Sequence, residues 1–206
     1  MYDAIIFDLD GTLWDASEPC AAGWNRALQM AGHDHLTVTA NDIRRVSGMP
    51  FDECVAALFS EVPDLDMDSL AAQIDIEERA ELHQRGGKLY PGVAKGLPEL
   101  AAYCPLFLIS NCQDWYLERF WQHSGLKGWF RDGDCHGSSG MPKAEMIARM
   151  CERHALASVI YIGDTASDQQ AAFSAGAAFG LAEYGFGESE TAHIRFRSFR
   201  KLISVL

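Results

Sequence analysis

Apolar residues follow two patterns along this chain. Short continuous apolar runs are typical of strands that are buried on both faces of a sheet. Such runs occupy residues 2–7, 105–109 and 159–162, and weaker ones occupy 130–135 and 177–181. Segments with helical spacing of apolar residues separate or follow the runs, at 93–103, 114–123, 142–154, 166–175 and 198–205. Strands that alternate with helices in this way predict an α/β fold, with a parallel sheet covered by helices on both faces.

Residues 16–86 differ from the rest of the chain because they contain no comparable apolar run. Helical patterns are predicted there at 20–30, 40–46, 52–59 and 68–82. We therefore expect two domains, a core made of residues 1–14 and 87–206 and a helical insertion over residues 15–86. The segments that join them, 13–17 and 86–91, are the expected hinge, and the second begins with two glycines that can absorb a change of backbone angles.

Polar residues follow each of the three clear strands. Asp8 and Asp10 follow the first, Ser110 and Asn111 the second, and Asp164 the third. Because parallel strands end at one edge of a sheet, where α/β proteins bind their ligands, we expect these side chains to lie together. Two neighbouring carboxylates repel each other, so Asp8 and Asp10 predict a divalent cation or a shared proton. An ordinary turn at Asp10-Gly11 is the alternative interpretation of that segment taken alone.

Composition and charge exclude several classes of protein. The 206 residues include 17 Lys and Arg against 29 Asp and Glu, a formal net charge of −12, which argues against general binding of nucleic acid or of an anionic membrane surface. No apolar run approaches the ~20 residues of a membrane helix, and the acidic amino terminus lacks the basic region of a signal peptide. The six cysteines form no C-x-x-C pair. We expect reduced thiols and a cytoplasmic protein.

Four separated motifs, in this order, are similar to those of the haloacid dehalogenase superfamily. They are Asp8-Leu9-Asp10-Gly11-Thr12, Ser110-Asn111, Lys143, and Gly163-Asp164-Thr165-Ala166-Ser167-Asp168. The chain resembles the members with a helical cap of the C1 type, in the branch of phosphoglycolate phosphatases and β-phosphoglucomutases. The resemblance implies a Rossmann-like core with an inserted helical cap, and a phosphohydrolase that acts on a small phosphorylated metabolite with Mg²⁺ as cofactor.

The resemblance also implies roles for the three aspartates at the strand ends. Asp8 would be the nucleophile that forms a phosphoaspartate. Asp10 would be the general acid and base, which requires a pKa near the working pH. Mg²⁺ would lie between the carboxylates of Asp8 and Asp164 and the backbone carbonyl of Asp10, because a small hard cation prefers oxygen ligands.

The remaining motif residues would support the phosphoryl group. By the same resemblance, Lys143 and Ser110 would be catalytic, and the backbone N–H of Asn111 and the hydroxyl of Thr12 would bind the phosphoryl oxygens. Asp168 would orient Lys143 or a metal-bound water. Each has a plainer interpretation when taken singly: Ser110 caps a helix, Lys143 is a solvated residue at a helix start, and Asp168 is an acid in a first helical turn.

The insertion is expected to set specificity. Arg44 and Arg45 precede a loop that resembles the specificity loop of related caps, so they are candidate substrate-binding residues, although cations are also favoured at a helix C-terminus. The acid at Asp10 favours an oxygen leaving group, as in a phosphatase. A sugar phosphomutase uses the same pair of aspartates and stays open as an alternative. A catalytically silent binding protein of the same fold is the third, and the oligomeric state stays unknown.

Overall fold

The structure, a computed structural model, describes residues 2–63 and 65–206. A parallel six-stranded sheet in the order β5-β4-β1-β6-β7-β8 forms its centre. The strands are β1 Ala4–Phe7, β4 Leu106–Ser110, β5 Phe130–Cys135, β6 Val159–Gly163, β7 Ala178–Ala182 and β8 Ile194–Phe196. The prediction of an α/β fold with a parallel sheet is confirmed.

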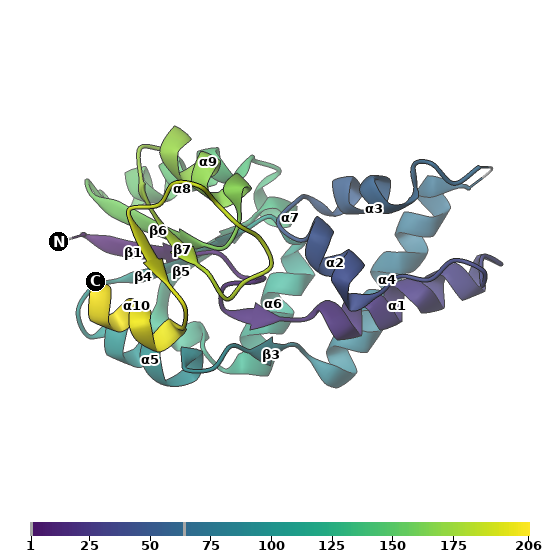
Figure 1. Cartoon of the computed structure of the whole chain (residues 1–206), viewed down its shortest axis with the longest axis horizontal. Helices are drawn as coiled ribbons and strands as arrows, with labels where there is room; N and C mark the ends of the chain where they lie inside the picture. Colours follow the sequence, from purple (N-terminus) through teal and green to yellow (C-terminus); the bar gives the residue numbers. More distant parts are fainter. Residues whose placement is uncertain (1, 64) are drawn as a thin grey trace.

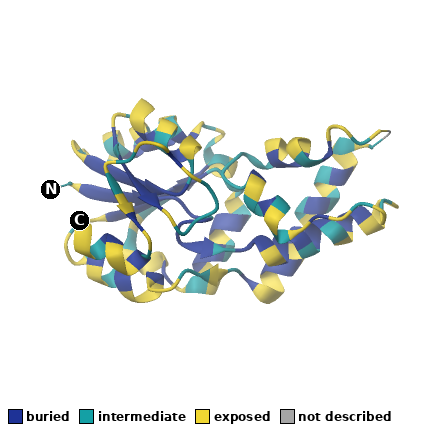
Figure 2. Ribbon diagram, viewed as in Figure 1, coloured by how far each residue is buried: buried dark blue, intermediate teal, exposed yellow. Residues whose placement is uncertain are grey.

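Helices cover both faces of this sheet (Figure 1). They are α5 Val93–Ala101, α6 Asp114–Ser124, α7 His136–Ser139, α8 Lys143–Arg153, α9 Ala166–Ser174 and α10 Phe199–Val205, with a 3-10 turn at Lys127–Trp129. Successive strand residues point to opposite faces. Ile5 and Phe7 of β1 therefore pack in the apolar cluster with α5, α6 and α10, whereas Ala4 and Ile6 pack in the cluster with α8 and α9. The central strands are buried along their length (Figure 2).

Four further helices lie together at one end of the molecule (Figure 1). They are α1 Ser17–Met30, α2 Ala40–Val46, α3 Phe51–Phe59 and α4 Met67–Arg85. Helices α1 and α4 pack closely because Gly23 has no side chain; a Cβ there would lie 2.6 Å from the Cα of Glu78. Helix α2 begins where predicted, since Thr39 and Asp42 form a capping box. Within the described residues, no helix is both long enough and apolar enough to cross a membrane.

The chain enters and leaves this helical part through two short strands. They are β2 Trp14–Asp15 and β3 Lys88–Leu89, which pair antiparallel, so the expected boundaries at residues 15 and 86 lie at or beside this pair. The sequence did not predict these strands or β8, because two or three residues cannot show an apolar run, and the middle residue of β8, Arg195, is exposed. All six cysteines are free thiols.

Candidate active site

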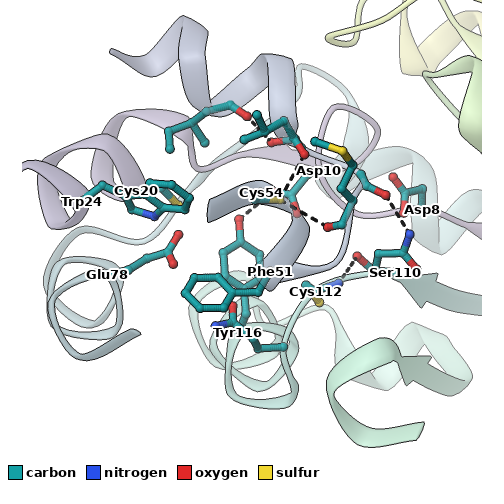
Figure 3. Close-up of a pocket in the computed structure, with 17 residues that line it drawn as sticks. Asp8, Asp10, Cys20, Trp24, Phe51, Cys54, Glu78, Ser110, Cys112 and Tyr116 are labelled. Atoms are coloured by element: carbon teal, nitrogen blue, oxygen red, sulfur yellow. Dashed lines mark hydrogen bonds between the residues drawn. The ribbon is translucent and has the colours of Figure 1, made fainter. Parts of the chain in front are cut away.

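The polar residues that follow β1, β4 and β6 meet at one edge of the sheet, as the sequence predicts. Asp8 directly follows β1, and its backbone N–H donates to the carbonyl of Ile162 in β6 at 2.8 Å. Ser110 ends β4 and Asp164 follows β6. Above this edge lies a pocket whose walls come from both the sheet edge and helices α1 to α4 (Figure 3). The strand-end residues that line it are Asp8, Asp10, Ser110 and Asn111.

The carboxylate of Asp8 is buried and held by Lys143. The Lys143 ammonium donates to Asp8 Oδ1 at 2.9 Å. The hydroxyl of Tyr161 lies 3.3 Å from the same oxygen, but its single proton has a closer acceptor in the carbonyl of Ile109, at 2.9 Å. Burial raises the pKa of Asp8 to about 6, and the positive charge of Lys143 opposes that rise. The sequence missed Tyr161, since it stands within the apolar run of β6 and looks like any other core residue. Lys143 therefore fixes the orientation of Asp8 at the base of the pocket, with the Tyr161 hydroxyl beside it.

Lys143, the first residue of α8, joins two carboxylates in the interior. Its ammonium also donates to Asp168 Oδ1 at 2.6 Å. The other oxygen of Asp168 accepts from the backbone N–H groups of Asp164 and Thr165, each at 3.1 Å, and from the Thr165 hydroxyl at 2.8 Å. Burial alone lowers the pKa of Lys143, but Asp168 and Asp8 outweigh it and raise that pKa, so the side chain is charged. Asp168 makes the contact with Lys143 that the resemblance implies.

Asp10 has two partners that the sequence did not indicate. Its Oδ1 accepts from the hydroxyl of Tyr116 at 2.6 Å and from the indole N–H of Trp14 at 3.1 Å. Burial raises the pKa of Asp10 to about 7; the Tyr116 hydrogen bond opposes this rise and the charge of Asp8 adds to it. A carboxyl group with a pKa near neutrality can both give and accept a proton at physiological pH.

Asp164 faces the turn that carries the two other aspartates. Its Oδ2 accepts from the backbone N–H of Phe186 at 2.7 Å. Gly11 lets this turn lie close to the Asp164 side chain, because its φ is 76° and a Cβ there would collide with the Asp164 carboxylate. Burial, together with the charges of Asp168 and Asp8, raises the pKa of Asp164 well above its usual range.

The acidic residues at this edge fit a magnesium ion. Asp8, Asp164 and Asp168 offer oxygen atoms that all lie within 4.8 Å of one another. Both oxygens of Asp168 are bound to Lys143 and to backbone N–H groups, so the carboxylates of Asp8 and Asp164 are the ones available to a cation. One ammonium does not balance three buried carboxylates, and a set of oxygen donors is what Mg²⁺ prefers.

Ser110 and Asn111 line the pocket, but Thr12 does not. The hydroxyl of Ser110 accepts from the backbone N–H of Cys112 at 3.2 Å. The Asn111 side chain donates to the carbonyl of Gly48 at 2.7 Å and so ties the sheet edge to the loop after α2, while its Oδ1 has no partner among the described residues. Thr12 is buried, and its hydroxyl donates to Asp164 at 3.4 Å instead of facing the pocket.

The structure does not bring the two candidate substrate-binding arginines to this pocket. Arg44 pairs with Asp15 at 2.8 Å, and Arg45, whose side chain is 68% exposed, pairs with Asp42 at 3.2 Å. Successive residues of a helix point about 100° apart. Helix α2 turns Ile43 and Val46 inward, whereas Arg44 reaches Asp15 and lies over the ring of Phe186 at 5.8 Å, and Arg45 is exposed. The part of this segment that lines the pocket is Ile43, Val46, Ser47, Gly48 and Met49.

A third acid in the pocket comes from α4. Glu78 is 5% exposed, and neither its Oε2 nor the indole Nε1 of Trp24 has a hydrogen-bond partner among the described residues. Burial raises the pKa of Glu78 to about 7, and the neighbouring Cys20 thiol and Trp24 indole N–H oppose this rise. The sequence holds a signal for this residue: Glu78 lies four residues from both Ile74 and Leu82, in the buried row of the helix.

Known proteins resemble this chain in sequence and in fold. Residues 5–182 match the family described as haloacid dehalogenase-like hydrolase. The chain is 31% identical over 196 residues to the phosphoglycolate phosphatase of Rhodobacter capsulatus, covering 90% of this chain and 86% of that one. It is 28% identical over 183 residues to that of Photobacterium profundum, covering 83% and 79%. A solved structure described as a predicted phosphoglycolate phosphatase, from Haemophilus somnus 129PT, has a TM-score of 0.85 at 21% identity, covering 99% and 97%.

The chain therefore belongs to the haloacid dehalogenase-like hydrolase family. It has the Rossmann-like core of that fold, as does a family member from Bacteroides fragilis that matches with a TM-score of 0.85 at 20% identity, covering 98% of this chain and 100% of that one. It is a phosphohydrolase, as the resemblance implied. The mutase alternative is not favoured, because the curated relatives are phosphatases.

Proposed function

We propose that this protein is a Mg²⁺-dependent phosphatase that hydrolyses small phosphate monoesters through a phosphoaspartate on Asp8. One observation carries the proposal. The buried Asp8 carboxylate is held by Lys143 at the base of a pocket that also contains Asp10. A nucleophile and a proton donor thus share one cavity, whose volume of about 70 Å³ favours a small substrate.

The positive charge that the reaction needs has two sources in this proposal. Mg²⁺ would be held by the carboxylates of Asp8 and Asp164 and the backbone carbonyl of Asp10, and when bound it offsets the negative charge of the phosphoryl oxygens. Lys143 supplies the second charge at 2.9 Å from Asp8. It reduces the repulsion between the carboxylate and an approaching phosphate dianion.

Two chemical steps follow from this arrangement. First, a carboxylate oxygen of Asp8 attacks phosphorus, the bond from phosphorus to the leaving oxygen breaks, and Asp10 gives that oxygen a proton. Then ionised Asp10 accepts a proton from a water molecule, whose oxygen attacks the phosphorus of the phosphoaspartate and releases phosphate and Asp8. A pKa of about 7 allows Asp10 both roles. Ser110 and Asn111 line the same pocket and would bind the phosphoryl oxygens.

The names of the relatives suggest one substrate to test. Because the curated relatives are called phosphoglycolate phosphatases, phosphoglycolate belongs in a panel of small phosphate esters. The leaving group of phosphoglycolate carries a carboxylate, so the hydrolysis of this ester also depends on the charge of the residues that line the pocket. The cytoplasmic location stays a prediction.

The Asp8→Asn variant tests the proposal. Asparagine keeps the shape of the side chain but is a poor nucleophile, so phosphate release with Mg²⁺ should fall by about 10³-fold or more while the fold is retained. Asp132→Asn is the matched control, because Asp132 pairs with Arg153 and His154 and does not line the pocket. Release near the wild-type rate from Asp8→Asn, or full wild-type activity after treatment with EDTA, would contradict the proposal.

A further inference from the structure

The end of the pocket away from Asp8 holds the buried acid Glu78, which lies beside the Cys20 thiol and the Trp24 indole. Figure 3 shows Glu78 and Trp24 at that end, with Phe51 and Tyr116 between them and Asp8 in this view. Glu78 is 5% exposed, and its Oε2 accepts no hydrogen bond among the described residues. The indole N–H of Trp24 is likewise unpaired there. The thiol and the indole beside Glu78 are neutral groups, so no charged partner balances this acid within the described part of the pocket.

No basic side chain faces this acid within the described part of the pocket, whose lining contains no lysine, arginine or histidine. Arg44 is paired with Asp15 at 2.8 Å, and Arg26 is paired with Glu81 at 2.7 Å. A negatively charged group bound near Glu78 would thus find no counter-charge there, and it would meet a like charge whenever Glu78 is ionised.

The residues at the Glu78 end of the pocket determine which kind of group can bind there. A second anionic group would be desolvated next to a carboxylate, and like charges repel strongly where water is excluded. A hydroxyl or an ammonium group can instead donate to a carboxylate oxygen of Glu78. The neighbouring rings of Trp24 and Phe51 suit an ammonium in particular, because the faces of aromatic rings attract cations. The cavity volume of about 70 Å³ limits the group to a few non-hydrogen atoms.

We propose that Glu78 selects the substrate by accepting a hydrogen bond from a hydroxyl or ammonium group on the leaving group. The preferred substrates are then phosphate monoesters of short alcohols or amino alcohols that carry no carboxylate. This inference rests on the proposed phosphatase function and adds the class of substrate to it. It also sets this chain apart from the phosphoglycolate phosphatases in its family, whose named substrate ends in a carboxylate.

Three esters of nearly equal size test the proposal. They are 2-aminoethyl phosphate, 2-hydroxyethyl phosphate and phosphoglycolate, which differ in the group that would face Glu78. At least one of the first two should be hydrolysed with a kcat/KM about 10²-fold above that of phosphoglycolate. Glu78→Gln keeps the shape of the side chain but removes its charge, and should reduce this ratio by about 10-fold or more, mainly through the KM of the preferred ester.

The matched control is Glu81→Gln. Glu81 lies on the same helix and is 7% exposed, but it pairs with Arg26 and does not line the pocket. Its replacement should leave the ratio unchanged, because a general loss of stability affects all three esters alike. Equal or better hydrolysis of phosphoglycolate by the wild type, or an unchanged ratio in Glu78→Gln, would overturn the proposal.

A binding measurement separates this inference from the proposed function. In the Asp8→Asn variant with Mg²⁺, the ester that is preferred should raise the melting temperature more than phosphoglycolate does. Equal stabilisation by all three esters, or stabilisation by none, would also overturn the role of Glu78. Failure of the proposed function gives a different result: the wild type releases no phosphate from any ester, while Asp8→Asn still ranks the three by binding.

Discussion

Replacing Asp168 by asparagine should destabilise the protein strongly, although the two side chains have the same shape. Asp168 uses both oxygens in the interior, one toward Lys143 and the other toward the backbone N–H groups of Asp164 and Thr165. Asparagine offers one acceptor and one NH₂ donor. Whichever way the amide is turned, its NH₂ faces either the ammonium or the two N–H groups, so buried donors lose their acceptor.

The size of the effect follows from burial of the ion pair. Removing one partner of a buried pair costs about 3–5 kcal/mol. Part of this is offset because Asp168 no longer repels Asp8 and Asp164, so we expect about 3 kcal/mol. For a chain of 206 residues, a loss of this size lowers the melting temperature by about 6–12 °C.

Asp42→Asn is the matched control for this prediction. Asp42 and Thr39 form the same capping box at the start of α2 that Asp168 and Thr165 form at the start of α9, but near the surface. Its loss should cost about 1 kcal/mol or less. Thermal and urea unfolding at neutral pH, with Mg²⁺ and again with EDTA, measure the difference between the two variants. If Asp168→Asn is no less stable than Asp42→Asn, the buried pair with Lys143 does not stabilise the fold and the reasoning is refuted.

Two other predictions concern Gly11, in the turn after β1, and Asp10, the proposed general acid and base. Gly11→Ala should lose more stability and Mg²⁺ affinity than Gly32→Ala. Both glycines have a positive φ, which costs an alanine about 1–2 kcal/mol. Of the two, only Gly11 is placed so that a Cβ would meet the Asp164 carboxylate. Equal unfolding free energies and equal calorimetric Mg²⁺ affinities would contradict this. Tyr116→Phe removes the hydrogen bond that holds the pKa of Asp10 down to about 7. That pKa should therefore rise and carry the optimum of the pH–rate profile to higher pH; an unchanged or lower optimum would count against Asp10 as the acid and base.

Much of the sheet could be predicted because burial imposes local periodicities on its elements. The strand expected at 159–162 is β6, and the helix expected at 142–154 contains α8. The meeting of Asp8, Ser110 and Asp164 was predictable too, since parallel strands end at a common edge. The short strands β2, β3 and β8 were not, because they are defined by backbone hydrogen bonds that nearly any residue can make.

The sequence by itself determined the fold class and the order of the motif residues along it. Only the tertiary structure decided which side chains complete the site. Tyr116 reaches Asp10, Glu78 lines the pocket with no basic residue facing it there, and Arg44 turns to Asp15. The physical reason is that periodicity records which face of an element is buried, whereas the partner of a polar side chain depends on how distant elements pack. Asp8 and Asp10 could thus be predicted from the sequence, but the pocket residues that would face their substrate could not.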